Sequence, residues 1–557
     1  MWCWGAGTRG GDDLAETLLV DPRPQEWLGE GPWAVVIRFP DGAILASVSS
    51  SLSAGLFWSD ELHPDGAPLL IVSARLGSVV QARRRPTQLQ GDYILDALLL
   101  RPSAQDSPYM GVQRISPGTC LRWSQPRQAP IREVWCGPEV WPPAHREGGA
   151  TRQRYLATFD QAVDGLVQAD QPLCATLSGG LDSPFVVASL VRHATPARPI
   201  HAFIHRPLPA AAAVTLGRSD PDEGPLAQAM ADAYPGLIRP IPVVVPEGEL
   251  PLDGARTWAD TTWAPTINPA NTLWYRAMGE RARALGANRL FMGSQGNAAY
   301  SGEHHYAARY YAARGDLGRL LALVRRGHAG GLSWGQACRR RLLVPLLAPW
   351  RQHLHRPQGP TYAELIGLAA LEPPRQPLMD RQRFLRWMRF DSGLNLMNQP
   401  DGHGVLPVDP FSCRTVQDFA AAITPLEWCQ GPYPRGYGRL LAEGRVPDAI
   451  RLRTRHGLQS ADGWHRIRHQ RQRYQQELQL LEATPLLANQ LDHARVRRTV
   501  EGWPWGEGGG APLLEVFSID RLLSVAGFLR FTSARLEQLA QRRPKATAAP
   551  DGEWQHP

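Results

Sequence analysis

Lysine is almost absent from this chain of 557 residues: Lys545, near the C-terminus, is the only one, so arginine supplies almost all of the positive charge behind the net charge of +8. Any mechanism that needs a lysine in the folded body is therefore excluded. Arginine is accompanied by much alanine, glycine, proline and tryptophan, and a genome rich in G and C explains this bias at least as well as selection for nucleic-acid binding. We predict no nucleic-acid partner.

Long apolar runs and paired cysteines are also missing. No apolar stretch approaches the ~18 residues that a membrane span needs, and the N-terminus lacks the basic and then apolar pattern of a secretory signal. The seven cysteines have no metal-binding spacing, and an odd number does not suit a disulfide framework. These absences predict a cytoplasmic protein with no membrane partner and with reduced, mostly buried cysteines. The length predicts two domains.

The most informative stretch begins with a short apolar run, Leu173 to Leu177, which predicts a strand, and ends with a helical pattern of apolar residues from Phe185. Between them stands Ser178-Gly179-Gly180-Leu181-Asp182-Ser183. The glycines permit a tight turn and a close backbone approach, so several N–H groups and the helix N-terminus can point at one phosphate. Asp182 suits such a site if a divalent cation bridges it to the phosphates. A structural turn capped by one of the serines is the alternative.

This hexad resembles the pyrophosphate-binding loop (PP-loop) of the asparagine synthetase and ATP-pyrophosphatase superfamily. The resemblance implies that ATP is split into AMP and pyrophosphate and that AMP activates a carboxylate, with Mg²⁺ as a cofactor. It also implies an α/β ATP-binding ligase domain with a parallel sheet and many helices, which we assign to residues 151–540. We expect residues 178–183 to bind ATP together with Gly293 and Gly296.

A second strand is predicted from Ile200 to His205, where this superfamily holds the adenine through main-chain groups. Asp222 and Glu223 stand just before a predicted helix, Pro225 to Ala233. Acidic side chains at this place either stabilise the helix N-terminus or belong to the ATP site, and the sequence leaves both readings open.

A second glycine-rich loop, Gly293-Ser294-Gln295-Gly296-Asn297, follows a predicted strand. In asparagine synthetases this loop reads Gly-Glu-Gly-Ala-Asp-Glu, and its aspartate shares the magnesium with the aspartate of the first loop. The aligned residue here is Asn297, whose amide oxygen can still bind magnesium, although more weakly. Asp182 and Asn297 are therefore the predicted metal ligands. A loop ending in Gly-Asn, after a segment rich in Pro, Asn and Trp (265–274), more closely resembles the macrolactam-forming cyclases of lasso-peptide biosynthesis.

A third block, residues 405–465, resembles the synthetase domain of the lasso cyclases in the order of its motifs. In asparagine synthetase and its β-lactam-forming relative, a lysine near the position of Arg455 stabilises the charge on the acyl-adenylate and pyrophosphate. Arg455 can hold phosphate charge in the same way, but it cannot act as a base. Asp418 occupies the matching helical position for a base, and Ser294 replaces the acid or tyrosine of other relatives. An ordinary capping or surface role for Asp418 is the alternative.

The N-terminal region, residues 1–140, resembles in layout the glutaminase-type β sandwich (Ntn hydrolase-like) of asparagine synthetases. In that family a cysteine directly after the initiator methionine becomes N-terminal, and its own amine serves as the base for its thiol. Here Trp2 follows Met1 and Cys3 lies one place too far in, while the Asn-Gly-Glu triplet that holds glutamine is missing between residues 91 and 100. We predict an inactive, glutaminase-like domain, with an active amidohydrolase as the alternative. A linker at residues 141–150 and a disordered tail at 541–557 complete the expected organisation.

These resemblances together imply an ATP-dependent lasso-peptide cyclase. Such an enzyme adenylates an Asp or Glu side chain of a precursor peptide and joins it to the N-terminal amine in an isopeptide (macrolactam) bond. The implied partners are the precursor peptide, a leader peptidase and a leader-peptide-binding protein. An ammonia-dependent asparagine synthetase is one alternative, opposed by Asn297 and Arg455. A non-catalytic peptide-binding scaffold is the other, opposed by the intact hexad with Asp182.

Overall fold

The computed structural model describes most of the chain: residues 30–51, 53–63, 67–100, 105–124, 129–136, 151–212, 219–302, 306–347, 402, 404–506 and 510–542, and the backbone of residues 2–5. The linker predicted at residues 141–150 lies outside the described residues, as does the predicted tail from residue 543 onward. The first two residues of that predicted tail belong to a helix, because the last helix of the chain ends at Arg542.

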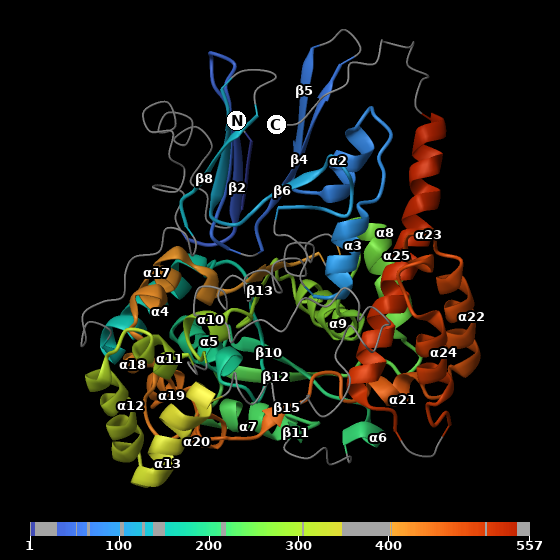
Figure 1. Cartoon of the computed structure of the whole chain (residues 1–557). Coiled ribbons are helices and arrows are strands. Elements are labelled where there is room, and N and C mark those ends of the chain that lie inside the picture. The colour runs from blue at the N-terminus through green and yellow to red at the C-terminus, as the bar shows by residue number, and fades with distance from the viewer. Residues whose placement is uncertain are drawn as a thin grey trace.

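Two antiparallel sheets form the N-terminal part of the molecule (Figure 1), with the strand orders β1-β2-β3-β7-β8 and β5-β4-β6. Their facing sides share one apolar core, in which Trp58 of β4 meets Trp123 of β7 edge to face, with ring centroids 5.4 Å apart. The strands are β1 (Trp2–Gly5), β2 (Trp33–Arg38), β3 (Ile44–Val48), β4 (Leu56–Leu62), β5 (Pro68–Ser73), β6 (Gln113–Ile115), β7 (Thr119–Trp123) and β8 (Ile131–Val134). Identification of these sheets with the glutaminase-type sandwich stays a prediction.

A second apolar core joins this N-terminal part to the C-terminal helices. Helix α3 (Gly91–Leu98) contributes the fully buried Ile94, and α25 (Leu513–Arg542) contributes the fully buried Ile519 to the same cluster. Trp263, which follows α8 (Pro251–Thr262), lies in this cluster too, and its carbonyl accepts a hydrogen bond of 2.8 Å from the hydroxyl of Tyr109. Residues far apart in the sequence therefore complete a single core between the two expected domains.

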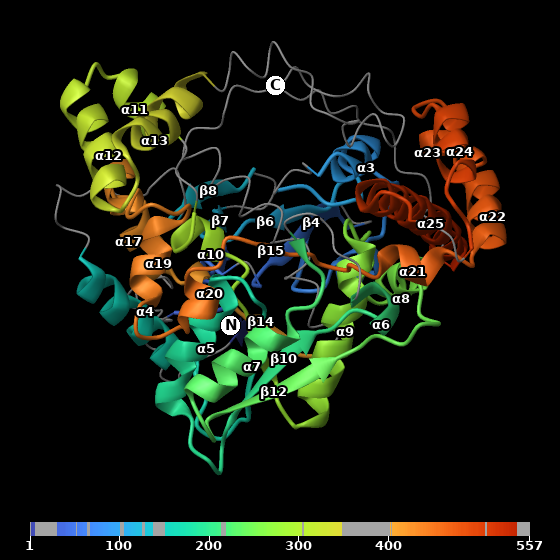
Figure 2. The ribbon, with the colours of Figure 1, turned by 90° about the horizontal axis from the view of Figure 1, so that it is seen from below.

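A five-stranded parallel sheet forms the centre of the larger part, in the order β12-β10-β9-β13-β14. Side chains alternate between its faces, so Leu173 and Ala175 of β9 pack with α5 (Asp182–Leu190) on one face, while Cys174 packs with α9 (Pro269–Ala284) on the other. This arrangement confirms the predicted mixed α/β domain with a parallel sheet and many helices (Figure 2). The strands are β9 (Leu173–Thr176), β10 (Ile200–His205), β12 (Ile238–Val243), β13 (Arg289–Phe291) and β14 (Leu406–Val408).

Helices cover both faces of the sheet, and the described part of the chain ends in helix α25 at Arg542. The helices around the sheet are α4 (Arg152–Leu166), α5 (Asp182–Leu190), α7 (Gly224–Ala233), α9 (Pro269–Ala284), α10 (Gly296–Ala299), α17 (Arg414–Ala422) and α19 (Gly436–Ala442). The peripheral helices are α2 (Leu76–Ala82), α6 (Pro209–Ala212), α11 (Ala307–Ala312), α12 (Leu317–Ala329), α13 (Trp334–Cys338), α18 (Pro425–Trp428), α20 (Asp448–Arg451), α21 (Gly463–Ile467), α22 (Arg471–Glu482), α23 (Pro485–Ala488) and α24 (His493–Glu501). None of the helices in the described part of the chain combines the length and the apolar character that crossing a membrane requires.

The order of the parallel strands reverses at one point, and this point fixes where the site lies. The chain adds β10 and β12 on one side of β9, then returns to add β13 and β14 on its other side. The loops after β9 and β13 therefore diverge at the carboxyl end of the sheet, which is where open α/β sheets form their ligand crevice.

Helix α25 carries a buried carboxyl group whose protonation is linked to folding. Asp520 is fully buried and accepts a hydrogen bond from the hydroxyl of Tyr474, and its second carboxyl oxygen has no donor among the described residues. Burial raises the pKa of Asp520 to about 7, and the hydrogen bond from Tyr474 lowers it only in part. Between about pH 4 and pH 7, Asp520 is therefore protonated in the folded protein, whereas the same carboxyl group is ionised in the unfolded chain.

We expect the free energy of unfolding to fall as the pH rises from about 4 to about 7, because in this window the folded state binds the extra proton of Asp520. Asp520→Asn keeps an acceptor for Tyr474 and should reduce this loss of stability, by about 4 kcal/mol at most. Urea unfolding across this pH range measures the effect. Exposed Asp232→Asn is the matched control; an equal change in that variant would contradict the assignment.

We expect the shared core to make the two parts unfold together. Ile94→Ala should cost about 2–5 kcal/mol, because it leaves a cavity in this core. Tryptophan fluorescence and far-ultraviolet circular dichroism during urea unfolding should shift as one transition. Met110→Ala, at a side chain that is 52% exposed, should change stability by less than about 0.5 kcal/mol. Two separate transitions, with only one moved by Ile94→Ala, would refute the shared core.

Candidate functional site

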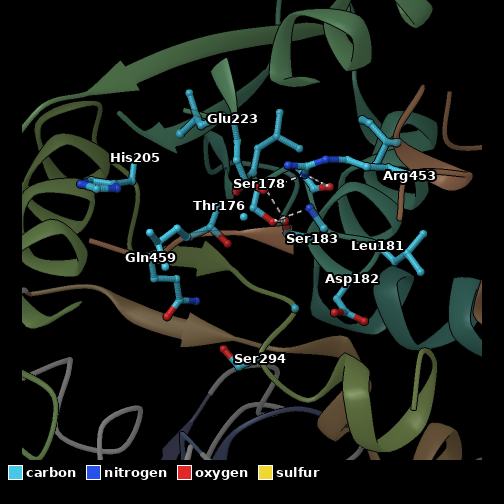
Figure 3. A pocket seen from close by; sticks show the side chains of 18 of the residues that line it. Thr176, Ser178, Leu181, Asp182, Ser183, His205, Glu223, Ser294, Arg453 and Gln459 are labelled. Carbon is cyan, nitrogen blue, oxygen red and sulfur yellow. Dashed lines mark hydrogen bonds and ion pairs between the residues drawn. The ribbon is translucent and has the colours of Figure 1, made fainter. Parts of the chain in front are cut away.

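A cavity of about 420 Å³ lies at the carboxyl ends of β9, β10 and β13 (Figure 3). Its walls come from the loop after β9, the carboxyl end of β10, the residues just before α7, helix α9, the loop after β13, and the segment from Pro434 to Gln459. Every residue of the hexad 178–183 lines it, as do Gly293, Ser294, Asn297 and Arg455. The structure thus brings together most of the residues that the sequence selected.

The serines of the first loop hold its turn closed. The Ser178 N–H donates to the hydroxyl of Ser183 over 2.9 Å, and the Gly180 N–H donates to the hydroxyl of Ser178 over 3.2 Å. The first turn of α5, which begins at Asp182, lies on the cavity wall. The N-terminal end of this helix can therefore face an anion in the cavity.

Gly179 allows three side chains to approach its backbone closely. A Cβ at this position would lie 2.5 Å from Nη1 of Arg453 and 2.7 Å from Oε1 of Glu223. The turn is therefore tight because the C-terminal arginine segment and the start of α7 press against it. This crowded backbone fits the expected phosphate cradle.

The two glycine-rich loops pack directly on each other. A Cβ at Gly293 would lie 2.9 Å from the backbone of Asp182 and Ser183, and a Cβ at Gly296 would lie 2.2 Å from a carboxylate oxygen of Asp182. Gly296 thus packs against the side chain of Asp182, and Gly293 packs against the backbone of the first loop. Neither position has room for a side chain.

Asp182 and Asn297 meet at one hydroxyl group. The hydroxyl of Ser301 donates to Oδ1 of Asp182 over 2.5 Å, and Oδ1 of Asn297 lies 3.3 Å from the same hydroxyl oxygen. Burial raises the pKa of Asp182, while Arg435, with Nη1 3.9 Å from the carboxylate, and Ser301 oppose the shift. Two oxygen ligands at adjacent places fit Mg²⁺. The described residues hold no cluster of three or more His, Cys, Asp or Glu side chains suited to a metal, so nucleotide and water would complete the coordination.

Asp409, directly after β14, holds the second loop in position. Its carboxylate accepts hydrogen bonds from the N–H groups of Gln295, over 2.7 Å, and Phe411, over 3.0 Å. Burial raises the pKa of Asp409 to about 7, and these backbone hydrogen bonds act in the opposite direction. Asp409 thus ties the loop carrying Ser294 and Asn297 to the neighbouring strand.

Two arginines of the C-terminal segment reach the cavity and share an acidic partner. Arg453, only 9% exposed, donates to the carbonyl of Gly179 over 2.9 Å and pairs with Asp220 and with Glu223. Arg455, 45% exposed, pairs with the other oxygen of Asp220 over 2.5 Å. Burial alone would raise the pKa of Asp220, but these arginines lower it. A short parallel pair, β11 (Ser219–Asp220) and β15 (His456–Gly457), fixes the two segments side by side.

Apolar and aromatic side chains line one part of the cavity: Ile204, His205, Trp274, Tyr275, Met278 and Met292. The rings of His205 and Trp274 stack with centroids 5.6 Å apart. Burial lowers the pKa of His205, so its ring is neutral at physiological pH. Tyr275 hydrogen-bonds Ser294, and burial raises the pKa of Tyr275 to about 12.

Asp418 is the one predicted catalytic residue that the structure leaves outside the cavity. It lies on α17 and pairs with Arg414, one turn earlier, over 3.4 Å. The cavity walls, among the described residues, do not include it. This position fits the alternative reading of Asp418 as an ordinary surface acid.

The sequence did not single out Arg453 or Asp409 as site residues, although both left a signal. Arg453 stands two places before the predicted Arg455, and both side chains pair with Asp220. Asp409 directly follows a strand of the parallel sheet, where polar residues commonly belong to a site. For Glu223 the sequence allowed either a helix-stabilising role or a place in the site. Glu223 lines the cavity and pairs with Arg453, and its side chain makes no capping hydrogen bond to α7.

Comparison with known proteins agrees with this geometry. The family model described as asparagine synthase matches residues 154–510, more than half of the chain. The matched region contains both glycine-rich loops and the arginine segment, whereas the N-terminal sheets precede it. No curated protein matches the chain in sequence.

The packing of Gly296 against Asp182 yields a direct test. Gly296→Ala should weaken nucleotide binding at least about tenfold, because the added methyl group must displace the Asp182 carboxylate from its place beside Asn297. Calorimetric titration with a non-hydrolysable ATP analogue and Mg²⁺ measures the affinity. Gly165→Ala, where nothing lies within 4 Å of the added Cβ, is the matched control. Equal affinity in the two variants would contradict the proposed packing.

Proposed function

The chain belongs to the asparagine synthase family, and on this basis we propose that it is an ATP-dependent peptide macrocyclase. The family forms carbon–nitrogen bonds with ATP, typically with Mg²⁺. The finer proposal is that an Asp or Glu side chain of a precursor peptide is adenylated and joined to the N-terminal amine of the same peptide. The observation that carries it is the convergence of the phosphate loop, Asp182 with Asn297, and two arginines on one cavity.

We propose that ATP binds with its phosphates on the hexad 178–183 and its adenine on the apolar end near His205. The turn of the hexad and the start of α5 suit the phosphates, and Arg453 with Arg455 places guanidinium groups beside them, held in position by Asp220 and Glu223. Mg²⁺ held by Asp182 and Asn297 would neutralise phosphate charge as the pyrophosphate leaves.

In the first step a carboxylate oxygen of the peptide attacks the α-phosphorus of ATP, and the bond to the pyrophosphate breaks. In the second step the N-terminal amine attacks the activated carbonyl carbon, AMP leaves, and the amine loses a proton. The sum is one ATP converted to AMP and pyrophosphate, with one water lost from the peptide. The protein contributes mainly orientation and electrostatic stabilisation. Asp418 has no role in this scheme, because it does not line the cavity.

The peptide is proposed to approach the cavity past Arg435. A small side cavity of about 40 Å³ shares Pro434 and Arg435 with the nucleotide cavity, and Arg340 and Arg341 also line it. Arginines on this side suit an acidic side chain on its way to the nucleotide. Arg435 has a left-handed backbone, with φ 59°, a conformation that costs energy and is often found at functional sites.

This function would also require partners. A leader peptidase must free the amine that closes the ring, and a leader-binding protein would deliver the precursor. The N-terminal sheets are proposed to act as an inactive, glutaminase-like scaffold. An ammonia-dependent asparagine synthetase would share the same nucleotide chemistry, so the acceptor has to be identified directly.

The deciding measurement is pyrophosphate release from ATP and Mg²⁺ with two sets of substrates. A leader-free candidate precursor peptide should stimulate release and lose the mass of one water. Release with aspartate and ammonia, and none with the peptide, would instead identify an asparagine synthetase. No pyrophosphate release with either set of substrates, even with partner proteins present, would favour a binding scaffold and overturn the proposal.

Asp182→Ala should abolish pyrophosphate release, because it removes the one carboxylate of the predicted metal site. Asp418→Asn is the matched control and should keep release within about twofold, because surface substitutions outside a site change little. Release retained by Asp182→Ala would refute the metal assignment. Loss of release in folded Asp418→Asn would return that residue to the mechanism.

A further inference from the structure

A second large cavity, of about 350 Å³, lies away from the nucleotide site, between α8, α22 and α25. Figure 2 shows α8, α22 and α25 together on one side of the molecule. Six of its lining side chains are apolar: Leu252, Ala259, Leu480, Leu523, Phe528 and Phe531. A cavity of this size and character is typical of a site for a small organic molecule.

Three arginines, one from each helix, stand around this apolar interior. Arg530 of α25 pairs with Glu477 over 2.7 Å, and Arg473 of α22 contacts the same carboxylate over 3.3 Å. Arg473 also pairs with Asp253 over 3.2 Å. Arg256 of α8 is exposed and has no ion pair or hydrogen bond with any described residue. The lining therefore holds three guanidinium groups and one carboxylate, an excess of two positive charges.

Three polar atoms in the wall make no hydrogen bond within the described part of the chain, and one of them, Nε of Arg473, has only the ion pair with Glu477. The hydroxyl of Ser524, a residue 7% exposed, accepts and donates no hydrogen bond within the described part of the chain. The same holds for Nη1 of Arg530, the nitrogen that does not face Glu477. Leaving such atoms unpaired costs about 1–3 kcal/mol each, so they point to a polar group that would occupy the cavity.

We propose that this cavity binds an organic acid with an apolar body. Its carboxylate would be held by Arg256 and by Nη1 of Arg530, because a guanidinium matches a carboxylate in shape and charge. Its apolar part would lie against Phe528 and the leucines, with Ser524 donating to the acid. This inference does not depend on the proposed cyclase activity, because none of these residues lines the nucleotide cavity.

Two kinds of ligand combine a carboxylate with an apolar body: a free medium-chain acid, and the carboxyl end of an apolar peptide. Calorimetric titration of the full chain with decanoate tests the first, and titration with acetyl-Leu-Leu-Phe tests the second. Each is compared with its neutral amide, decanamide or acetyl-Leu-Leu-Phe-amide. The acid should bind at least about tenfold more tightly than its amide, because only the acid makes charge-assisted hydrogen bonds. The arm that shows this difference identifies the source.

Gly527→Leu provides a variant that fills the cavity without disturbing the fold. Gly527 lines the cavity inside α25, and the nearest atom to an added Cβ is Nη2 of Arg530, 3.9 Å away. Leucine also favours a helix more than glycine does, so the melting temperature should be equal or higher. Binding of the acid should be lost in this variant.

Arg256→Gln tests the charge separately and should weaken binding of the acid about tenfold while leaving binding of the amide unchanged. Arg471→Gln, which removes an exposed arginine of α22 that does not line the cavity, is the matched control and should bind as the parent does. Equal binding of acid and amide, binding that survives Gly527→Leu, or no binding of either acid would each overturn the proposal.

Discussion

Gly293 and Gly296 lie directly against Asp182, and this contact determines the positions of the other groups in the nucleotide cavity. The two glycine-rich loops follow different strands and could in principle adopt many relative positions. Backbone packing removes that freedom: Gly293 and Gly296 of the second loop press on Asp182 of the first, and Ser301 connects Asp182 to Asn297. Asp409 then fixes the second loop from the side of β14. The metal ligands are thus positioned by contacts that need no metal, which is the preorganisation that catalysis by orientation requires.

The arginine segment shows how a chain without lysine in its folded body assembles a cationic site. An ammonium group at the end of a flexible side chain can be placed almost anywhere, whereas a guanidinium group needs partners that hold its plane. Here Asp220 and Glu223 hold Arg453, and the short β11–β15 pair brings them to it. Positive charge beside the phosphate loop therefore depends on residues more than two hundred positions away in the sequence.

Local patterns predicted much of this molecule because the relevant information is local. The apolar run at 173–177, the glycines after it and the helical spacing from Phe185 are features of neighbouring residues only. The structure has β9, a loop and α5 at these places. Asn297 lines the cavity because its loop follows β13, the strand next to β9 in the sheet. Asp418 was selected by its place in a family pattern, and only the packing of α17 could reveal that it lies outside. The role of Asp409 was equally hidden, since it depends on which strands become neighbours.

The core that α3 shares with Trp263 and α25 has a consequence for how such a chain can change over evolutionary time. A region that completes the interior of its neighbour is constrained by packing, whether or not it performs chemistry of its own. Its exposed positions are free to drift, but its inward-facing residues can change only together with those of the helices they touch. The N-terminal part could therefore change over most of its surface and still be impossible to delete, because its removal would expose the apolar side of α25 to water.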